Sequence, residues 1–256
     1  MTPEQKARVS IDALLVAAGW HVCNVSDANI HAATGVAIRE FPLNPGFGFA
    51  DYLLYVNGKA CGVIEAKKEG ATLTGVELQS SRYAQGLPAA LPAWRRPLPF
   101  VWESTGVETH FTNGLDPEPR ARSVFAFFRP ELLVQWLAYL PNPANGAAAQ
   151  ETPGTFLARM RSMPPLVTEW GAGGAHYQLW PAQISAITNL EKSLAANKPK
   201  ALIQMATGSG KTFTSIGFIY RLIKFGGARR VLFLVDRGNL ARQTKKEFDA
   251  YASPYN

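Results

Sequence analysis

The sequence predicts an α/β protein with two successive domains, and three observations support this fold class. Strand-like and helix-like segments alternate along the 256 residues, as in sheets covered by helices. The stretch 141–153, PNPANGAAAQETP, is rich in Pro, Ala and Gly without hydrophobic periodicity, which is typical of a linker. A glycine-rich turn at 206–212 separates an apolar segment from a helix. Buried strands are expected at 201–205 and 231–235, and helices at 211–225 and 239–251, which indicates parallel strand–helix–strand units. We therefore place the domains at 1–145 and 175–256, joined by a linker at 146–174.

Bulk composition indicates a globular protein of the cytoplasm. A hydrophobic content of 47% is sufficient for a sizeable core. No run approaches the roughly 20 apolar residues of a membrane span, and the first residues lack the layout of a secretory signal. Cys23 and Cys61 have no spacing that indicates zinc or a disulfide framework, so both are expected to be small buried side chains.

The formal net charge of +7 is unevenly distributed. Residues 1–150 carry 12 Lys and Arg against 13 Asp and Glu, giving −1, whereas residues 151–256 carry 14 against 6, giving +8. Clustered Lys and Arg gain affinity for a phosphate backbone by releasing its counterions. The basic surplus of the second half therefore suits a surface that follows nucleic acid.

The elements of the first domain follow from capping and alternation signals. Thr2, Pro3 and Gln5 predict the start of a helix through a capping box, and Gly19 predicts its end. Asn57-Gly58 is a typical hairpin turn. Strands are expected at 36–41, 49–56 and 60–66, and further helices at 74–85 and from Pro130 to Leu137.

The predicted hairpin carries a set of charged residues suited to phosphodiester hydrolysis. Asp51 lies near the start of its first strand, and Glu65 and Lys67 lie at the end of its second. Because side chains alternate along a strand, Glu65 and Lys67 point to one face. Hydrolysis requires a hard cation that makes a bound water more acidic, and carboxylate oxygens suit Mg²⁺. We expect Asp51 and Glu65 to be metal ligands and Lys67 to orient the water or stabilise charge.

The register of the hairpin decides whether these residues meet. With a simple two-residue turn at Asn57-Gly58, Asp51 would pair with Ile64 and Glu65 would face away. We therefore predict either a three-residue loop, Val56-Asn57-Gly58, or a bulge. In either case Asp51 is expected to oppose Val63 and to share a face with Glu65.

The helix expected at 74–85 places two further polar residues on one face. Gln79 and Tyr83 are four positions apart, which brings them together for contact with a substrate. Glu40, at the end of the strand 36–41, is interpreted either as a further active-site acid or as a solvated strand end.

The turn from Ala206 to Thr212, ATGSGKT, has the properties of a phosphate-binding loop. Glycines allow backbone N–H groups to converge on phosphate oxygens, and the following helix contributes its positive end. Lys211 is expected to reach the β and γ phosphates of ATP, and the Thr212 hydroxyl to hold Mg²⁺. The remaining cofactor-binding candidates within the loop are Thr207, Gly208, Ser209 and Gly210.

This loop and its flanks resemble the motifs of superfamily 2 helicases and DNA translocases. Met205 replaces the leading glycine of the strict phosphate-loop pattern, as is common in that superfamily. The segment 179–187, LWPAQISAI, resembles the glutamine motif, in which Gln183 would contact adenine; Gln178 is an alternative. The segment 231–243 is similar to the next helicase motif, which contacts DNA. The resemblance implies a RecA-like domain that continues past Asn256, and hence an incomplete ATPase in a fragment of a longer protein.

Asp51, Glu65, Lys67, Gln79 and Tyr83 together resemble the PD-(D/E)xK nucleases of the type I restriction family, although Phe49-Ala50 stand where the pattern has proline. Both halves resemble the amino-terminal part of the restriction subunit of a type I restriction-modification enzyme. The resemblance implies Mg²⁺-dependent cleavage of double-stranded DNA coupled to ATP-dependent translocation, in a complex with methyltransferase and specificity subunits. Two alternatives remain open: a nuclease-helicase of another defence or repair system, and a nuclease-like DNA-binding module that does not cleave.

Overall fold

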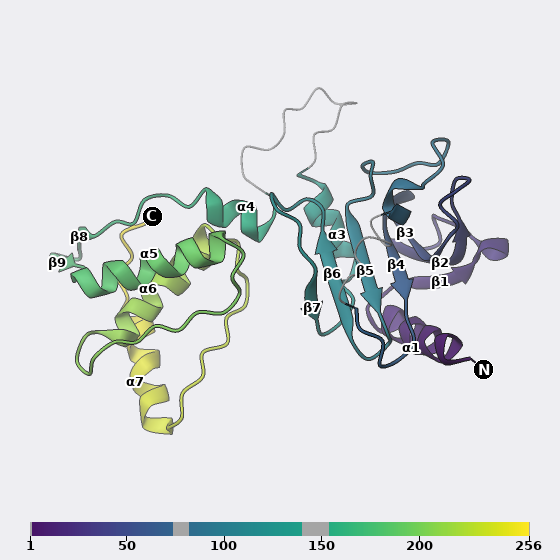
Figure 1. Cartoon of the computed structure of the whole chain (residues 1–256). Helices are drawn as coiled ribbons and strands as arrows, with labels where there is room; N and C mark the ends of the chain where they lie inside the picture. The colour runs from purple at the N-terminus through teal and green to yellow at the C-terminus, as the bar shows by residue number, and fades with distance from the viewer. Residues whose placement is uncertain (1, 74–81, 140–153, 256) are drawn as a thin grey trace. The chain divides into compact units, whose positions relative to one another are not determined.

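The structure is a computed structural model of the chain (Figure 1), and it describes residues 2–73, 82–139 and 154–255. The chain divides into two compact units, Met1–Gln150 and Glu151–Asn256. Within the described ranges, every helix is too short or too polar to reach across a lipid bilayer.

The first unit is built on one mixed sheet whose seven strands lie side by side in chain order (Figure 1). Its first and fourth strand pairs are parallel, and the other four pairs are antiparallel. The strands are β1 His21–Asn24, β2 Gly35–Pro42, β3 Phe49–Val56, β4 Lys59–Ala66, β5 Phe100–Ser104, β6 Thr109–Asn113 and β7 Arg122–Val124. The helical elements are α1 Pro3–Ala17, the short 3-10 helix η1 Val25–Asp27, and α3 Pro130–Leu137.

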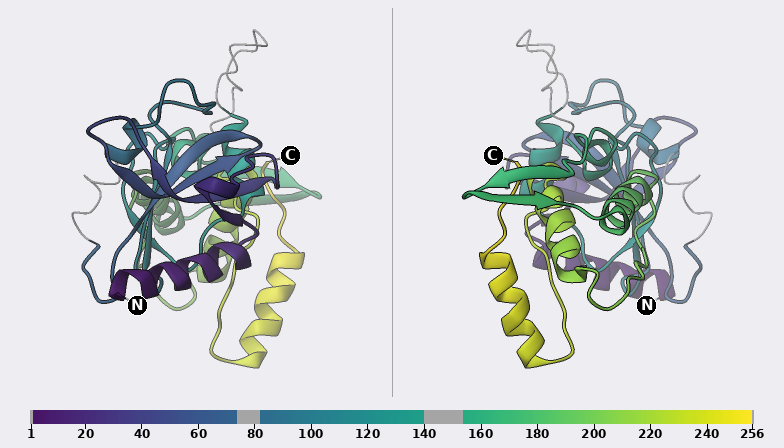
Figure 2. Two further views of the ribbon diagram at one scale, coloured as in Figure 1. Left: turned by 90° about the vertical axis from the view of Figure 1, so that its right-hand side faces the viewer. Right: turned by 90° about the vertical axis from the view of Figure 1, so that its left-hand side faces the viewer.

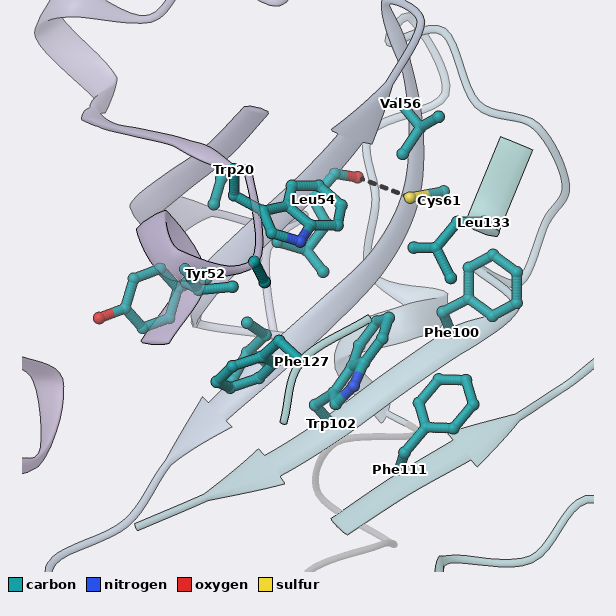
Figure 3. Packing of buried hydrophobic residues seen from close by; sticks show 14 of the residues in the cluster. Trp20, Tyr52, Leu54, Val56, Cys61, Phe100, Trp102, Phe111, Phe127 and Leu133 are labelled. Atoms are coloured by element: carbon teal, nitrogen blue, oxygen red, sulfur yellow. Dashed lines mark hydrogen bonds between the residues drawn. The ribbon is translucent and has the colours of Figure 1, made fainter. Parts of the chain in front are cut away.

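Each face of this sheet has its own hydrophobic core. The face covered by α1 and α3 includes the large aromatic residues seen in Figure 3, which pack around Trp102 and Phe111 with ring centroids 4.6 Å apart. The opposite face is covered by the segment that follows residue 82, and Leu53 and Val63 belong to it. A sheet buried on both faces requires apolar residues at successive positions, as in β3.

Local sequence signals gave correct elements in this unit. The capping box at the start of α1 is present: the Thr2 hydroxyl accepts from the Gln5 N–H, and the Thr2 N–H donates to the Gln5 side chain. The three predicted strands correspond to β2, β3 and β4, and the apolar helix from Pro130 corresponds to α3. Both cysteines are buried and unpaired, as expected. Of the helix predicted at 74–85, only residues 82–85 are described, and they are helical.

The second unit consists mainly of helices with one small hairpin. The helices are α4 Phe156–Arg161, α5 Pro181–Ala195, α6 Lys211–Lys224 and α7 Gly238–Asp249, and the hairpin joins β8 Glu169–Ala172 to β9 Ala175–Gln178. The helices predicted to begin at Lys211 and Asn239 are therefore present as α6 and α7.

The prediction of buried strands at 201–205 and 231–235 is wrong. Both stretches lack strand hydrogen bonding and run as coil beside the helices (Figures 1 and 2). A strand needs backbone partners on a neighbouring strand, and no described residue pairs with either stretch. Their apolar side chains are correspondingly exposed, with Leu202 at 94% and Leu232 at 82%.

Candidate active site

The hairpin between β3 and β4 combines a tight turn with a β-bulge. Asn57 and Gly58 both have positive φ, 48° and 74°, which defines a type I′ turn, and Val56 pairs with Lys59 across it. The register then shifts between Leu54 and Tyr55, where Cys61 is the extra residue on β4. The Cys61 thiol donates to the Leu54 carbonyl at 3.4 Å (Figure 3). Of the two devices predicted for this hairpin, the bulge is confirmed and the three-residue loop is wrong.

This bulge sets which residues of the two strands lie at the same level. Beyond it, Leu53 pairs with Val63 and Tyr52 with Ile64, and Asp51 and Glu65 are the next residue along each strand. The predicted pairing of Asp51 with Val63 is therefore wrong, because Val63 pairs with Leu53. The two carboxyl groups are close enough for Asp51 to raise the pKa of Glu65, and their expected position on one face of the sheet stays a prediction.

The Asp51 carboxylate is partly buried, and both of its oxygens have partners. Oδ2 accepts from the Ala66 backbone N–H at 2.8 Å. Oδ1 accepts from the Arg8 guanidinium, which also donates to Glu40. The bond to Ala66 fixes Asp51 against the end of β4, next to the glutamate on that strand.

Glu65 is more deeply buried, with 4% of its side chain exposed. Its Oε1 accepts from the Lys67 ammonium at 2.6 Å, and its Oε2 is buried without a hydrogen-bond partner among the described residues. Burial raises the pKa of Glu65 to about 7, opposed by the bond from Lys67 and increased by the nearby Asp51 carboxylate. Burial would lower the pKa of Lys67, but the bond to Glu65 and the negative charges of Glu65 and Asp51 together outweigh this effect, and the pKa is raised. Lys67 therefore compensates the charge at Oε1 of Glu65, and Oε2 is the carboxylate oxygen that has no described hydrogen-bond donor.

These groups fit a magnesium ion by their chemistry. Hard carboxylate oxygens are the ligands Mg²⁺ prefers, and it is typically held by one or two carboxylates together with water and substrate phosphate. Asp51 and Glu65 supply two such groups, and the orphaned Oε2 of Glu65 is an acceptor that still needs a partner. Within the described part of the chain, no group of three or more His, Cys, Asp or Glu residues could hold a metal by itself.

Tyr83 belongs to the surroundings of this site. It packs, half-buried, at the border of the core that contains Leu53 and Val63, and its hydroxyl contributes to raising the pKa of Lys67. Gln79, its predicted companion, lies outside the described residues.

Three residues near the site were missed as members of it by sequence reasoning. Glu103 on β5 pairs in parallel register with Glu65 and is completely buried, and His110 on β6 pairs with Glu103. Arg8 reaches Asp51 from α1. The β-rich run at 100–104 was the available signal for Glu103. Side chains alternate along a strand, so Glu103 and its neighbour Trp102 point to opposite faces of the sheet. No local signal indicates which distant carboxylate Arg8 contacts.

The candidate phosphate-binding loop of the second unit contains two glycines in the left-handed region of φ. Gly208 and Gly210 have φ of 79° and 76°, a region that other residues rarely adopt, and α6 begins immediately afterwards at Lys211. The Lys211 ammonium donates to the Ala206 carbonyl at 3.0 Å. Thr207, Ser209 and Thr212 lie in the same turn, so all the predicted phosphate-binding candidates are contiguous at the start of one helix.

Gln183 contacts this loop directly, whereas Gln178 does not take part in its described hydrogen bonds. The Gln183 side chain accepts from the Trp180 N–H at 2.9 Å and donates to the Ser209 carbonyl at 3.2 Å. A Cβ at Gly210 would lie 2.5 Å from Gln183 Nε2, so the glycine is required for this close approach. Gln178 is exposed at the end of β9. Of the two glutamines, Gln183 is therefore the one that contacts the loop.

Comparison with known families finds similarity to restriction enzyme subunits in both units of the chain. Residues 27–106, which include the acidic hairpin, match the second domain of the type I restriction enzyme EcoKI endonuclease subunit. Residues 176–256, which include the phosphate-binding loop, match the res subunit of type III restriction enzymes.

The individual relatives of the chain are endonuclease subunits of type I restriction enzymes. The chain is 26% identical to the type I restriction enzyme EcoKI endonuclease subunit of Escherichia coli strain K12, over 96% of this chain and 23% of that protein. It is 41% identical to the EcoAI endonuclease subunit of Escherichia coli over 25% of this chain and 8% of that protein. It is 26% identical to the SauCOLORF180P endonuclease subunit of Staphylococcus aureus strain COL, over 79% of this chain and 21% of that protein. The chain is thus related to the endonuclease subunits of type I restriction enzymes, and the sequence resemblance is confirmed.

The chain spans about a quarter or less of the length of these relatives. Among solved structures, it is similar to a fragment of an HsdR subunit of a type I restriction enzyme from Vibrio vulnificus YJ016, with 19% identity and a TM-score of 0.37 over 87% of this chain and 38% of that chain.

Proposed function

We propose that this chain is the nuclease and first motor segment of a type I restriction subunit, and that its first unit cleaves double-stranded DNA with Mg²⁺. The proposal assigns a PD-(D/E)xK nuclease domain to 1–145 and a RecA-like domain to 175–256. The observation that carries it is the bulged hairpin, which aligns Asp51 with Glu65 beside Lys67. The relation to type I endonuclease subunits supports the same reading.

Each residue has a separate task in this proposal. A bound Mg²⁺ supplies Lewis acidity and a more acidic water. Asp51 and Glu65 present oxygen ligands, and their burial strengthens attraction to a cation because little water screens it. Lys67 lies against Glu65, where its ammonium can orient the attacking water and offset the negative charge that develops on the phosphate. Gln79 and Tyr83 are assigned to substrate contact.

The proposal predicts that supercoiled plasmid is nicked or linearised by the chain with Mg²⁺ and remains intact with EDTA. Glu65→Ala should reduce the rate by roughly a hundredfold or more, because even the outer partners of metal ligands contribute about 10- to 100-fold. Glu69→Ala is the matched control, since Glu69 is exposed beyond the end of β4 and its loss should leave the rate unchanged. Equal cleavage by wild type and Glu65→Ala would remove the nuclease assignment and leave a DNA-binding module.

For the second unit we propose ATP binding by the loop from Thr207 to Thr212, with Gln183 at the adenine side. ATP-dependent translocation and assembly with methyltransferase and specificity subunits belong to the same proposal, which rests on the family relation and on the surplus of basic residues in 151–256. The loop supports phosphate binding because two glycines with positive φ lead directly into the N-terminus of α6, where backbone N–H groups lack helical partners.

Lys211→Ala is expected to weaken binding of a fluorescent ATP analogue by about tenfold or more, since the loss of a charge-assisted bond to phosphate costs about 1.5–3 kcal/mol. The measurement is fluorescence anisotropy of the analogue with Mg²⁺. Lys224→Ala, at the exposed far end of α6, removes the same charge away from the loop and should not change affinity. An equal loss of affinity in both variants would indicate that the ATP analogue is attracted nonspecifically to the basic surface.

A further inference from the structure

Arg8 joins the first helix to the acidic hairpin through two carboxylates at once. Its Nη1 contacts Glu40 on β2 and its Nη2 contacts Asp51 on β3. A planar guanidinium suits such a bridge because its donors form a fixed fork. The side chains differ in burial: Asp51 is 13% exposed and Glu40 is 66% exposed. One partner of Arg8 therefore belongs to the candidate metal site, and the other faces solvent.

The position of Glu40 is unusual for a strand residue. Its neighbours pair as Arg39 with Tyr52 and Phe41 with Ala50, so Glu40 lies directly opposite Asp51. Its φ is 48°, in the left-handed region that a residue with a side chain adopts only at a cost. Such a conformation persists where surrounding contacts impose it, and it is found here at the one position that faces Asp51.

Helix α1 is fixed against the sheet next to this bridge. Asp12, one turn after Arg8, accepts from the Tyr52 hydroxyl at 2.8 Å and from Arg39 at 3.0 Å. The same Arg39 donates to Asn24 at 3.0 Å. These contacts hold the helix at a defined place on β2 and β3, so Arg8 is delivered to Asp51 by a rigid element (Figure 1).

In this arrangement a cation entering the site meets a positive charge already bound to Asp51. Oδ2 of Asp51 is bound by the Ala66 N–H, and Oδ1 is bound by Arg8. Glu65 differs, because its Oε2 is buried and has no described partner. Oε2 of Glu65 therefore offers a divalent ion an oxygen that no described donor already binds, whereas binding to Oδ1 of Asp51 competes with the guanidinium.

We propose that Arg8 is a positioning residue that occupies Asp51 in the metal-free protein and yields Oδ1 to a divalent cation, while Glu40 retains the guanidinium. The inference rests on the proposed metal site. Arg8 and Glu40 then set how tightly the site binds its metal, and they keep the two neighbouring acids of β2 and β3 from repelling each other before the metal arrives.

The test is Mn²⁺ binding to the intact chain, measured by isothermal titration calorimetry with Mn²⁺ as a probe of the divalent site. Arg8→Met removes the guanidinium but keeps the apolar part of the side chain and a similar helix propensity. The variant protein should bind Mn²⁺ roughly tenfold more tightly, because the cation no longer competes with a charge-assisted hydrogen bond to Asp51, and tenfold is the lower end of what such a bond contributes. Lys6→Met is the control for net charge, because Lys6 is an exposed residue of the same helix; it should bind like the wild type. Weaker or unchanged affinity in Arg8→Met would overturn the proposal.

A second variant tests the role of Glu40 independently. Glu40→Gln should weaken Mn²⁺ binding, since Arg8 then has only Asp51 as its ionised partner, and should have little effect when combined with Arg8→Met. An equal effect of Glu40→Gln in both backgrounds would show that Glu40 does not act through Arg8, and would overturn the proposal. Failure of the proposed nuclease site has a different signature: wild type and Arg8→Met would both bind no Mn²⁺, or Glu65→Gln would bind it normally.

Discussion

Glu65→Gln is expected to make the metal-free first unit more stable than the wild type, by about 1–3 kcal/mol at pH 8. Burial raises the pKa of Glu65 from its ordinary value of 4.5 to about 7. The ionised carboxylate is therefore disfavoured in the folded protein relative to the unfolded chain. Glutamine has nearly the same shape and can still accept from Lys67, but it carries no charge that must be desolvated.

The stability that Glu65→Gln gains over the wild type should depend on pH. A raised carboxyl pKa means that the folded state binds more protons, so Glu65 lowers stability as pH rises from about 4.5 to 7. The stability difference between Glu65→Gln and the wild type should be largest above this window and absent below it. Urea unfolding in EDTA across pH 4 to 8 measures the difference, and Glu69→Gln serves as the exposed control. A gain that persists unchanged at pH 4 would contradict this explanation.

Mg²⁺ should reverse the order of stability if the proposed site is correct. A ligand that binds only the folded state stabilises it by an amount that grows with the logarithm of its concentration above Kd. Wild type should then gain stability with added Mg²⁺, while Glu65→Gln should not. The variant would thus exchange function for stability, which is a common property of active sites.

Arg221→Met is expected to destabilise the second unit by about 3–5 kcal/mol, the usual loss when one partner of a buried ion pair is removed. Arg221 is 1% exposed on α6 and contacts Glu191 on α5 at 2.6 Å. It also donates to the Pro164 carbonyl at 2.6 Å and to the Tyr255 hydroxyl at 2.5 Å. One side chain therefore connects two helices and two loops, and its removal leaves the Glu191 charge without its partner.

Hydrogen exchange of the α5 and α6 amides in the intact chain would measure this loss for the second unit alone. Lys224→Met, one turn further along α6 and exposed, should have no comparable effect. Adding Glu191→Gln to Arg221→Met should recover part of the stability, because it removes the uncompensated charge. Unchanged exchange in Arg221→Met would show that the contacts of Arg221 are energetically neutral.

The parts of the structure that sequence predicted are those determined by local chemistry. The capping box at Thr2 and the turn at Asn57-Gly58 involve residues within a few positions of one another. The bulge was also predictable, because a chemical requirement for Asp51 and Glu65 to share a face excluded a simple hairpin. Its exact place at Cys61 was not, since several positions satisfy the same parity.

The missed features depend on contacts between distant parts of the chain. Glu103 joins the site only through pairing of β4 with β5, and the two strands are separated by more than thirty residues of loop and helix. Arg8 meets Asp51 across 43 positions. Conversely, the apolar segments 201–205 and 231–235 have the composition of buried strands but lack the neighbours that would make them so. Composition indicates a capacity for pairing, and long-range topology decides whether the pairing occurs.

The extra residue at Cys61 limits how this hairpin can change in length. Because the tight turn and the bulge together set the parity of the strand pair, a single insertion in the turn would exchange inward and outward positions throughout β4 unless the bulge were lost at the same time. Length changes of two residues, or an insertion paired with a deletion, would keep Asp51 and Glu65 together. A loop grafted onto this hairpin must therefore change its length in compensated steps.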